Sequence, residues 1–201
     1  MVITIKLDRR KRSEHPENGR MLFQYSDIVS IPEWPKGPLV ELIEGDLFVV
    51  PSPNIKHQRI SMRIESQLKE FLNQNPMAEM FHAPVDVILS NEDVVIPDIL
   101  IVLNENSGII GEKNLQGTPD LVIEILSMNE KKDIVTKKQL YERYGIKEYW
   151  IVDPEKETVT VNYFDSQSGH FDPILTHSEN DIISSKLLPE FKMIAGQIFN
   201  P

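Results

Sequence analysis

The sequence predicts a single α/β domain in which helices cover both faces of a mixed β-sheet. Segments with the apolar period of a helix alternate with shorter apolar segments typical of strands, in the order hairpin, helix, strands, helix, strands. Two of the strand segments, 94–103 and 120–126, are apolar at nearly every position, as expected of strands that are buried on both faces.

The length and amino-acid composition of the chain exclude several classes of protein. The chain has 201 residues, of which 40% are hydrophobic, so we expect one domain over 21–201 behind a flexible N-terminal arm over 1–20. The absence of cysteine excludes disulfides and thiolate metal sites. Because no apolar run is long enough for a membrane span or a signal peptide, we expect a cytoplasmic protein with no membrane partner.

The net charge indicates how the protein could interact with nucleic acid. A charge of −10 argues against a protein that coats nucleic acid through bulk attraction. It leaves room for an enzyme that cuts nucleic acid, because such an enzyme gathers carboxylates around metal ions, and bound cations reverse the local field. Four basic residues lie at 9–12; we interpret them as part of a solvated arm, with a nucleic-acid contact as the alternative.

The N-terminal half predicts a short helix, a hairpin and a long helix. Ser26 is a candidate cap for the short helix, and two apolar arms within 40–50 flank a tight turn at 44–46. The long helix is expected over 54–75, with Asn54 as its N-cap. Its apolar residues fall on one stripe: Ile60, Ile64, Leu68, Phe71 and Leu72.

The C-terminal half predicts strands with one helix among them. A turn at 90–93 separates the first two strands, and a polar loop covers 104–118. The helix is expected over 131–144, where Gly145 ends it. Strands are expected over 81–89, 94–103, 120–126, 148–153 and 158–164.

Charged residues inside buried strands are the main functional signal. Asp98 and Glu124 lie in the two most apolar strands, where a lone carboxylate is costly unless it is paired or bound to a metal. Pro97 removes a ladder hydrogen bond, so we expect the strand to fray or bend beside Asp98. Taken singly, Asp98 could cap a turn and Glu124 could pair with a buried base. Together, on neighbouring central strands, they could bind a cation jointly.

A lysine lies near the middle of the apolar arc of the helix after Glu124. Lys137 needs an anionic partner there, which could be Asp133, one turn earlier, or the Asp98–Glu124 pair. The second possibility assembles the parts of metal-assisted phosphodiester hydrolysis. Carboxylates hold Mg²⁺, the metal activates water and shields the phosphate, and the lysine orients the nucleophile or stabilises developing charge.

Two further residues lie close to these elements. Glu41, in the first arm of the hairpin, is a candidate additional acid. His57 lies on the same side of the long helix as Ile60; we prefer a structural role for it, because a histidine at such a place is more often structural than catalytic. His82, His170 and His177 have no metal-binding spacing with it. The chain contains no phosphate-binding loop, serine nucleophile elbow or dinucleotide fingerprint.

Several of these segments resemble, in order and spacing, the Uma-two family of restriction-endonuclease-like proteins, a branch of the PD-(D/E)XK nuclease superfamily. The matching stretches are VELIEGDL at 40–47, PSP at 51–53, HQRI at 57–60, VIPDI at 95–99, TPDLVIEILS at 118–127, DIVTK at 133–137 and GIKEYWIVDP at 145–154.

The resemblance implies a restriction-endonuclease-like fold and a Mg²⁺-dependent endonuclease, with Mn²⁺ as a possible substitute, that cleaves DNA. It implies that Asp98 and Glu124 bind the metal, that Lys137 is catalytic, and that Glu41 binds a second metal or orients the first. Leu126 stands where the superfamily motif has its lysine, so the lysine is expected from the following helix. A homodimer is expected, since many nucleases of this fold pair two sites to cut two strands.

Two other functions remain open on the residues alone. The acidic charge and the lack of a basic stripe favour a binding or assembly protein that keeps the nuclease fold without cleavage. A metal-dependent hydrolase that acts on a small phosphoester is the third possibility.

Overall fold

The structure is a computed structural model that describes residues 22–30, 39–127, 133–172 and 175–200. The predicted arm at 1–20 lies outside the described residues. The elements in chain order are α1 (Tyr25–Val29), β1 (Val40–Ile43), β2 (Asp46–Val49), α2 (Ile55–Gln74), β3 (Ala78–His82), β4 (Val87–Ile88), β5 (Val94–Val95), β6 (Ile99–Leu103), the 3-10 helix η2 (Asn104–Ile109), β7 (Leu115–Gln116), β8 (Leu121–Ile125), α3 (Asp133–Arg143), β9 (Glu148–Asp153), β10 (Thr158–Asp165), β11 (His170–Phe171), β12 (Leu175–Ser178), β13 (Ile182–Ser184), β14 (Lys192–Ile194) and α4 (Gly196–Phe199).

Two sheets carry most of these strands. Among the described residues, the larger sheet has the order β11-β10-β9-β8-β6-β3, with β12 also paired to β10. Its central strands β8 and β9 run parallel, whereas β6 and β10 on either side of them are antiparallel. The smaller sheet has the order β2-β1-β5-β4-β7, and β13 pairs with β14 as a separate hairpin. The mixed α/β architecture predicted from the sequence is therefore confirmed.

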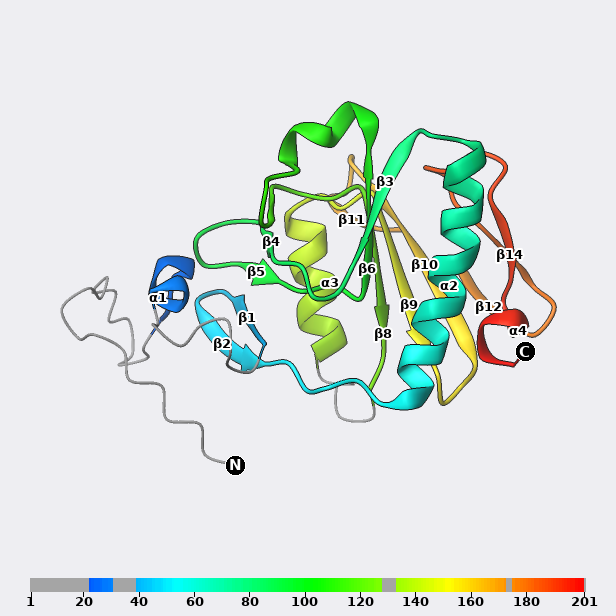
Figure 1. The fold of residues 1–201 in the computed structure, drawn as a ribbon, viewed down its shortest axis with the longest axis horizontal. Helices are drawn as coiled ribbons and strands as arrows, with labels where there is room; N and C mark the ends of the chain where they lie inside the picture. The colour runs from blue at the N-terminus through cyan, green and yellow to red at the C-terminus, as the bar shows by residue number, and fades with distance from the viewer. Residues whose placement is uncertain (1–21, 31–38, 128–132, 173–174, 201) are drawn as a thin grey trace.

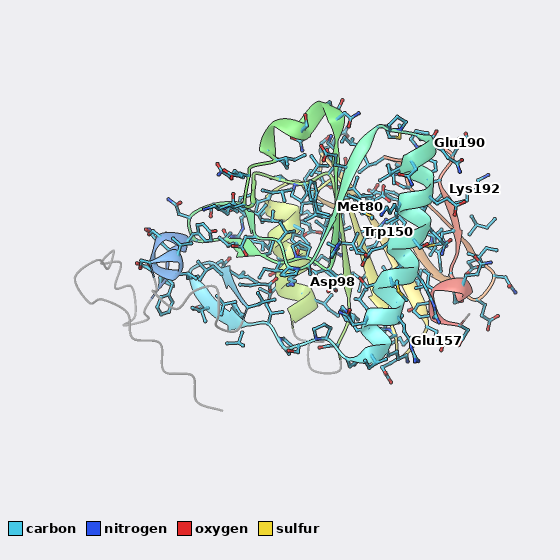
Figure 2. All side chains as sticks on the ribbon, in the orientation of Figure 1. Met80, Asp98, Trp150, Glu157, Glu190 and Lys192 are labelled. Carbon is cyan, nitrogen blue, oxygen red and sulfur yellow. The ribbon has the colours of Figure 1, made fainter. Side chains whose placement is uncertain are left out.

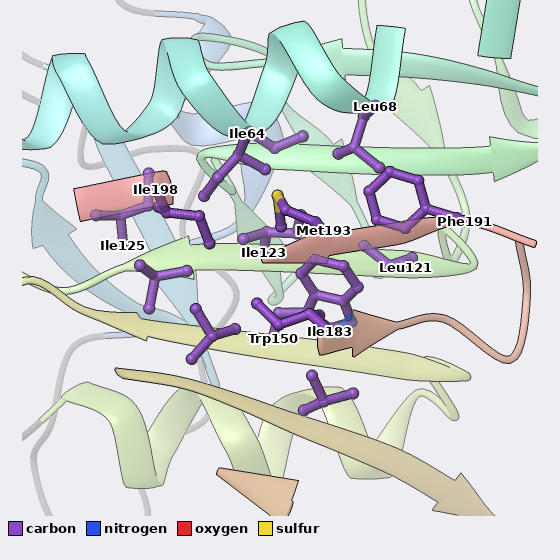
Figure 3. Close-up of a cluster of buried hydrophobic side chains, with 14 of the residues drawn as sticks. Ile64, Leu68, Leu121, Ile123, Ile125, Trp150, Ile183, Phe191, Met193 and Ile198 are labelled. Atoms are coloured by element: carbon purple, nitrogen blue, oxygen red, sulfur yellow. The ribbon is translucent and has the colours of Figure 1, made fainter. Parts of the chain in front are cut away.

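Helices α2 and α3 cover opposite faces of the larger sheet (Figure 1). Successive residues of a strand point to opposite faces, so each central strand contributes to both cores. Ile99 and Ile123 join the apolar cluster beneath α2, whereas Leu100 and Val122 join the cluster beneath α3. Figure 3 shows the first cluster, in which the fully buried Trp150 lies between strands of the sheet and the C-terminal hairpin.

The hairpin and the long helix form as the sequence predicts. Glu44 and Gly45 both have positive φ, 53° and 76°, as the two central residues of a tight hairpin turn require. Helix α2 begins after Asn54, whose side chain accepts a hydrogen bond from the backbone N–H of His57. The short helix α1 begins one residue before the predicted cap Ser26, because Gln24 and Asp27 form a reciprocal capping box.

The predicted strand over 94–103 is divided at Pro97. Val94 and Val95 form β5 in the smaller sheet, and β6 begins at Ile99 in the larger sheet, so the chain changes sheets at 96–98. Proline has no N–H for a ladder hydrogen bond, which explains why pairing stops there. Figure 2 shows Asp98 near the middle of the molecule, between α3 and α2.

Three other predicted boundaries change. The expected strand over 81–89 is divided into the end of β3 and the short β4, which pair in different sheets. The expected loop over 104–118 contains η2 and β7. Helix α3 begins at Asp133, and residues 128–132 lie outside the described part of the chain. No helix in the described residues is long and apolar enough to span a membrane.

Candidate active site

Four segments that are far apart in the chain bring charged side chains to one cleft. Glu41 comes from β1, Asp98 from the link between β5 and β6, Glu124 from β8, and Lys137 from α3. All four line a cleft of about 1040 Å³ whose wall also includes the first two turns of α2. The four residues singled out in the sequence are therefore brought to one place by the fold.

Glu124 faces α3 because of the period of its strand. It is two residues after Val122, which lies in the core beneath α3, so its side chain points to the same face. Lys137 and Tyr141 are four residues apart on α3 and share one side of the helix. The amino group of Lys137 lies 3.0 Å from Glu124 Oε1, and the hydroxyl of Tyr141 donates to the same oxygen at 2.6 Å.

Lys137 bridges two carboxylates. Its amino group also donates to Glu41 Oε1 at 2.9 Å, and that oxygen accepts a second hydrogen bond, of 2.8 Å, from the backbone N–H of Ile96. The anionic partners of Lys137 are thus Glu124 and Glu41, whereas Asp98 forms no ion pair with it among the described residues. The side chain of Asp133, the alternative partner, lies outside the described part of the chain.

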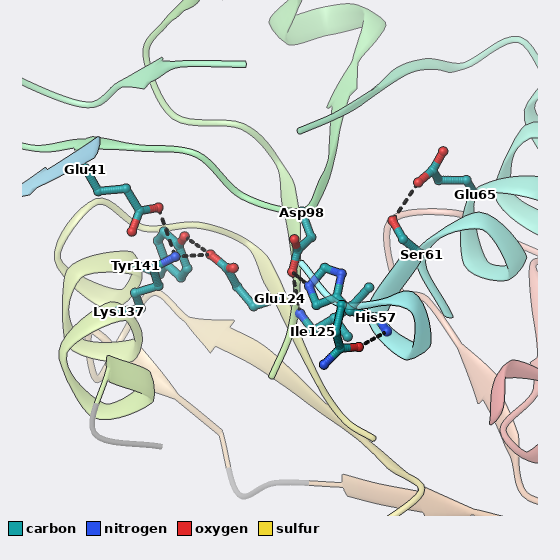
Figure 4. A network of polar contacts seen from close by, with 10 residues as sticks. Glu41, His57, Ser61, Glu65, Asp98, Glu124, Ile125, Lys137 and Tyr141 are labelled. Atoms are coloured by element: carbon teal, nitrogen blue, oxygen red, sulfur yellow. Dashed lines mark hydrogen bonds and ion pairs between the residues drawn. The ribbon is translucent and has the colours of Figure 1, made fainter. Parts of the chain in front are cut away.

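Asp98 is held from the other side of the cleft. Its Oδ2 accepts a 2.7 Å hydrogen bond from the backbone N–H of Ile125 and lies 3.2 Å from Nε2 of His57 (Figure 4). Since Ile125 follows Glu124 on β8, the same strand supplies one acid and holds another. His57, for which the sequence favoured a structural role, is placed by the first turn of α2 against a candidate metal ligand.

Burial and crowding of like charges shift the ionisation of this cluster. Burial raises the pKa of Glu124 to about 7; Lys137 opposes that rise, and the negative charges of Asp98 and Glu41 add to it. Burial by itself lowers the pKa of Lys137, but the charges of Glu124 and Glu41 outweigh it, so the pKa lies well above its usual value. Among the described residues, Lys137 thus pairs with two of the three acids, and the negative charges of the cluster outnumber its ammonium charge when all three acids are ionised.

The donor set fits a hard divalent cation. Among the described residues, the hydrogen bonds of the Asp98 carboxylate all go to Oδ2 and those of Glu124 to Oε1, which leaves one oxygen of each carboxylate without a protein hydrogen bond. No three His, Cys, Asp or Glu side chains in that part of the chain are close enough to hold a metal unaided. Mg²⁺, however, commonly binds through one or two carboxylates and completes its shell with water and substrate phosphate.

Comparison with known proteins decides the family. Residues 28–196 match the family model Uma2, described as "Putative restriction endonuclease". The chain belongs to the Uma2 family. The resemblance predicted from the sequence motifs is therefore confirmed, and the matched region contains every candidate site residue.

A solved structure supports the fold of this Uma2 protein. It is described as a putative nuclease belonging to DUF820 from Anabaena variabilis, is 19% identical in sequence, and superposes with a TM-score of 0.73. The match covers 88% of the present chain and 97% of the other. At this identity the similarity establishes a shared fold. No curated protein matches the chain.

Among the described residues, Tyr141 and His57 are the two whose side chains contact the acids although they were not predicted as site residues. Tyr141 follows Lys137 by one helical turn, and that spacing was a signal that it shares the side of α3 that faces the acids. His57 gave a weaker signal, since its partner Asp98 is 41 residues away and belongs to another element.

Proposed function

We propose that this Uma2 protein is a metal-dependent endonuclease that hydrolyses phosphodiester bonds in DNA. The observation that supports the proposal is the convergence of Glu41, Asp98, Glu124 and Lys137 on one cleft from four separate segments. Placing two buried carboxylates and the partly buried carboxylate of Asp98 near one another is unfavourable unless cations compensate, so the arrangement is better explained by a function than by stability.

Each of the four residues has a role that follows from its contacts. Asp98 and Glu124, each with one carboxylate oxygen that accepts no hydrogen bond from a described residue, would hold the cation, and Glu41 would orient that cation or hold a second one. Lys137 Nζ, fixed between Glu41 and Glu124, orients the attacking water or stabilises negative charge that develops on the phosphate. A bound Mg²⁺ supplies Lewis acidity and lowers the pKa of water.

The test is plasmid cleavage with Mg²⁺ or Mn²⁺ by the wild type and by Lys137→Ala. Removing a donor aimed at developing charge costs about 10²-fold or more in rate, so we expect a loss of that size. Lys138→Ala is the matched control, because Lys138 is the next lysine on α3 and forms no ion pair among the described residues. Equal cleavage by Lys137→Ala and wild type would remove Lys137 from the mechanism.

A second candidate is a binding or assembly protein that keeps the fold without cleavage. One observation favours it: the ammonium group of Lys137 pairs with both Glu41 and Glu124 and so neutralises part of their charge. Calorimetric titration with Mn²⁺ discriminates between the two functions. Mn²⁺ binding that is lost in Asp98→Ala and Glu124→Ala supports the nuclease, whereas no such binding by the wild type supports the alternative.

A further inference from the structure

The histidine beside Asp98 is anchored by the start of α2. Asn54 accepts a 2.9 Å hydrogen bond from the backbone N–H of His57, which fixes the first turn of the helix. The side chain of His57 is largely buried, with 10% of it exposed, and lines the same cleft as the three acids. Both the backbone and the ring of His57 are thus held where the ring meets Asp98.

The direction of the hydrogen bond follows from the chemistry of the partner. An ionised carboxylate offers lone pairs and no hydrogen, so the 3.2 Å contact to Asp98 Oδ2 requires a hydrogen on Nε2 of His57. Together with the backbone N–H of Ile125, at 2.7 Å, this places two donors on one oxygen of Asp98. A carboxylate held in this way has lost most of its rotational freedom before any cation arrives.

The other two acids are held in the same manner. Oε1 of Glu124 accepts from Lys137 and Tyr141, and Oε1 of Glu41 accepts from Lys137 and the backbone of Ile96. In each case two donors occupy one oxygen. His57 is the side-chain donor that completes this pattern for Asp98, and it comes from α2, on the other side of the cleft from Lys137 (Figure 4).

We infer that His57 is a positioning residue: its Nε2–H fixes Oδ2 of Asp98 and leaves Oδ1 to bind the cation. This inference rests on the proposed function, because it assigns His57 a role in the metal site proposed there. Donors that orient a metal ligand from behind contribute about 10- to 100-fold to metal affinity. A histidine that served the packing of α2 alone would change the stability of the protein and leave the affinity of the folded protein unchanged.

The test is calorimetric titration of the full chain with Mn²⁺, with circular dichroism to confirm that each variant is folded. We expect His57→Ala to weaken Mn²⁺ binding by about 10- to 100-fold. His57→Gln should recover most of the affinity, because its amide nitrogen can reach a position near that of Nε2. His57→Asn, whose amide is one carbon shorter, should not. His82→Ala is the matched control, because His82 lines the same cleft and contacts the backbone oxygen of Ala83 instead.

The outcomes separate this inference from the proposed function. Wild-type affinity in His57→Ala overturns the role of His57, and if Asp98→Ala has lost Mn²⁺ binding at the same time, the proposed metal site stands. Equal loss in His57→Gln and His57→Ala also overturns it, since the donor would then not be the cause. If His57→Ala does not fold, the Mn²⁺ affinities of His57→Gln and His57→Asn are compared instead. Tighter binding by the Gln variant supports the role of His57, and equal affinities overturn it. Absence of Mn²⁺ binding by the wild type overturns the metal site and this inference together.

Discussion

The hydroxyl of Tyr141 donates a 2.6 Å hydrogen bond to Oε1 of Glu124, the oxygen that also accepts from Lys137. Tyr141 is fully buried, so this contact is made away from water, where an unmade hydrogen bond is costly. Burial, followed by the charges of Glu124 and Glu41, raises the pKa of Tyr141 well above its usual value, which keeps the hydroxyl protonated and able to donate.

Tyr141→Phe tests the energetic role of that bond. A hydrogen bond to a charged group contributes about 1.5–3 kcal/mol, so at a pH above about 7, where Glu124 is ionised, we expect the free energy of unfolding to fall by about that amount in urea denaturation. Tyr149→Phe is a matched control. Tyr149 is also fully buried, and its ring packs edge-on against that of Tyr141 with the ring centroids 4.9 Å apart, but its hydroxyl has no hydrogen-bond partner among the described residues. Equal destabilisation by the two variants would contradict the assignment.

The raised pKa of Glu124 in the folded protein predicts how the free energy of unfolding depends on pH. In the folded protein its pKa is about 7, against 4.5 for the free group, so between these values the folded state binds more protons than the unfolded state. The contribution of Glu124 is therefore fully present below about pH 4.5, falls as the pH rises toward about 7, and is constant above that.

Glu124→Gln isolates this contribution, because other titrating groups such as Glu148 are present in both proteins. We expect the unfolding free energy of the wild type, minus that of Glu124→Gln, to fall between about pH 5 and about pH 7 in urea denaturation with a chelator present. A difference that stays constant or rises over this range would show that Glu124 does not titrate in the way its surroundings imply.

Asp93 ties the β1–β2 hairpin to the end of α3. Its carboxylate accepts from the backbone N–H of Glu44 and from the hydroxyl of Tyr144, each at 2.7 Å, and the side chain is 6% exposed. Since Glu41 lies on this hairpin and Lys137 on this helix, the link also sets the separation of two candidate site residues. We expect Asp93→Ala to lower the unfolding free energy by about 2–4 kcal/mol and to reduce plasmid cleavage.

Asp165→Ala is the control for Asp93, because Asp165 also accepts hydrogen bonds from backbone N–H groups, those of Gln167 and Ser168, but at the end of β10, where these hydrogen bonds are exposed. Its effect on unfolding should be much smaller than that of Asp93→Ala. Loss of stability with unchanged cleavage in Asp93→Ala would mean that the hairpin does not control the placement of Glu41.

The homodimer expected from the family stays a prediction. Cutting both strands of a duplex with one site per chain is most direct when two chains act together, as in closed symmetric dimers. Light scattering after size-exclusion chromatography should give twice the mass of 23.1 kDa at concentrations that cleave plasmid. A monomer that makes double-strand breaks under those conditions would contradict it.

Local signals were enough for the long elements. The apolar stripe of α2 and the cap at Asn54, the turn at Glu44 and Gly45, and the buried strands β8 and β9 all depend on neighbouring residues, and all formed as predicted. The division of 81–89 between β3 and β4 was missed. Which sheet each half joins is decided by pairing with strands elsewhere in the chain, which leaves no trace in the local pattern.

The candidate site shows the same boundary between local and long-range information. Its acids and its lysine were recognised from the sequence because a charge in an apolar segment is unfavourable without a partner, whatever that partner is. Glu124 was among the partners predicted for Lys137, but two other partners were not recognisable: Lys137 also pairs with Glu41, 96 residues away, and Asp98 meets His57 across the cleft. Tyr141, a core residue by its period, proved to be a donor to Glu124.

By itself, the sequence determined the family, the α/β class and the charged residues that lie within apolar segments. Only the tertiary structure decided that Lys137 bridges Glu41 and Glu124 and that α2 brings His57 to Asp98. It also decided that the chain leaves the smaller sheet and enters the larger one at Pro97. The physical reason is that burial cost is a property of one residue and its neighbours in the chain, whereas hydrogen bonds and ion pairs join atoms that only the packing of distant segments brings within about 3 Å.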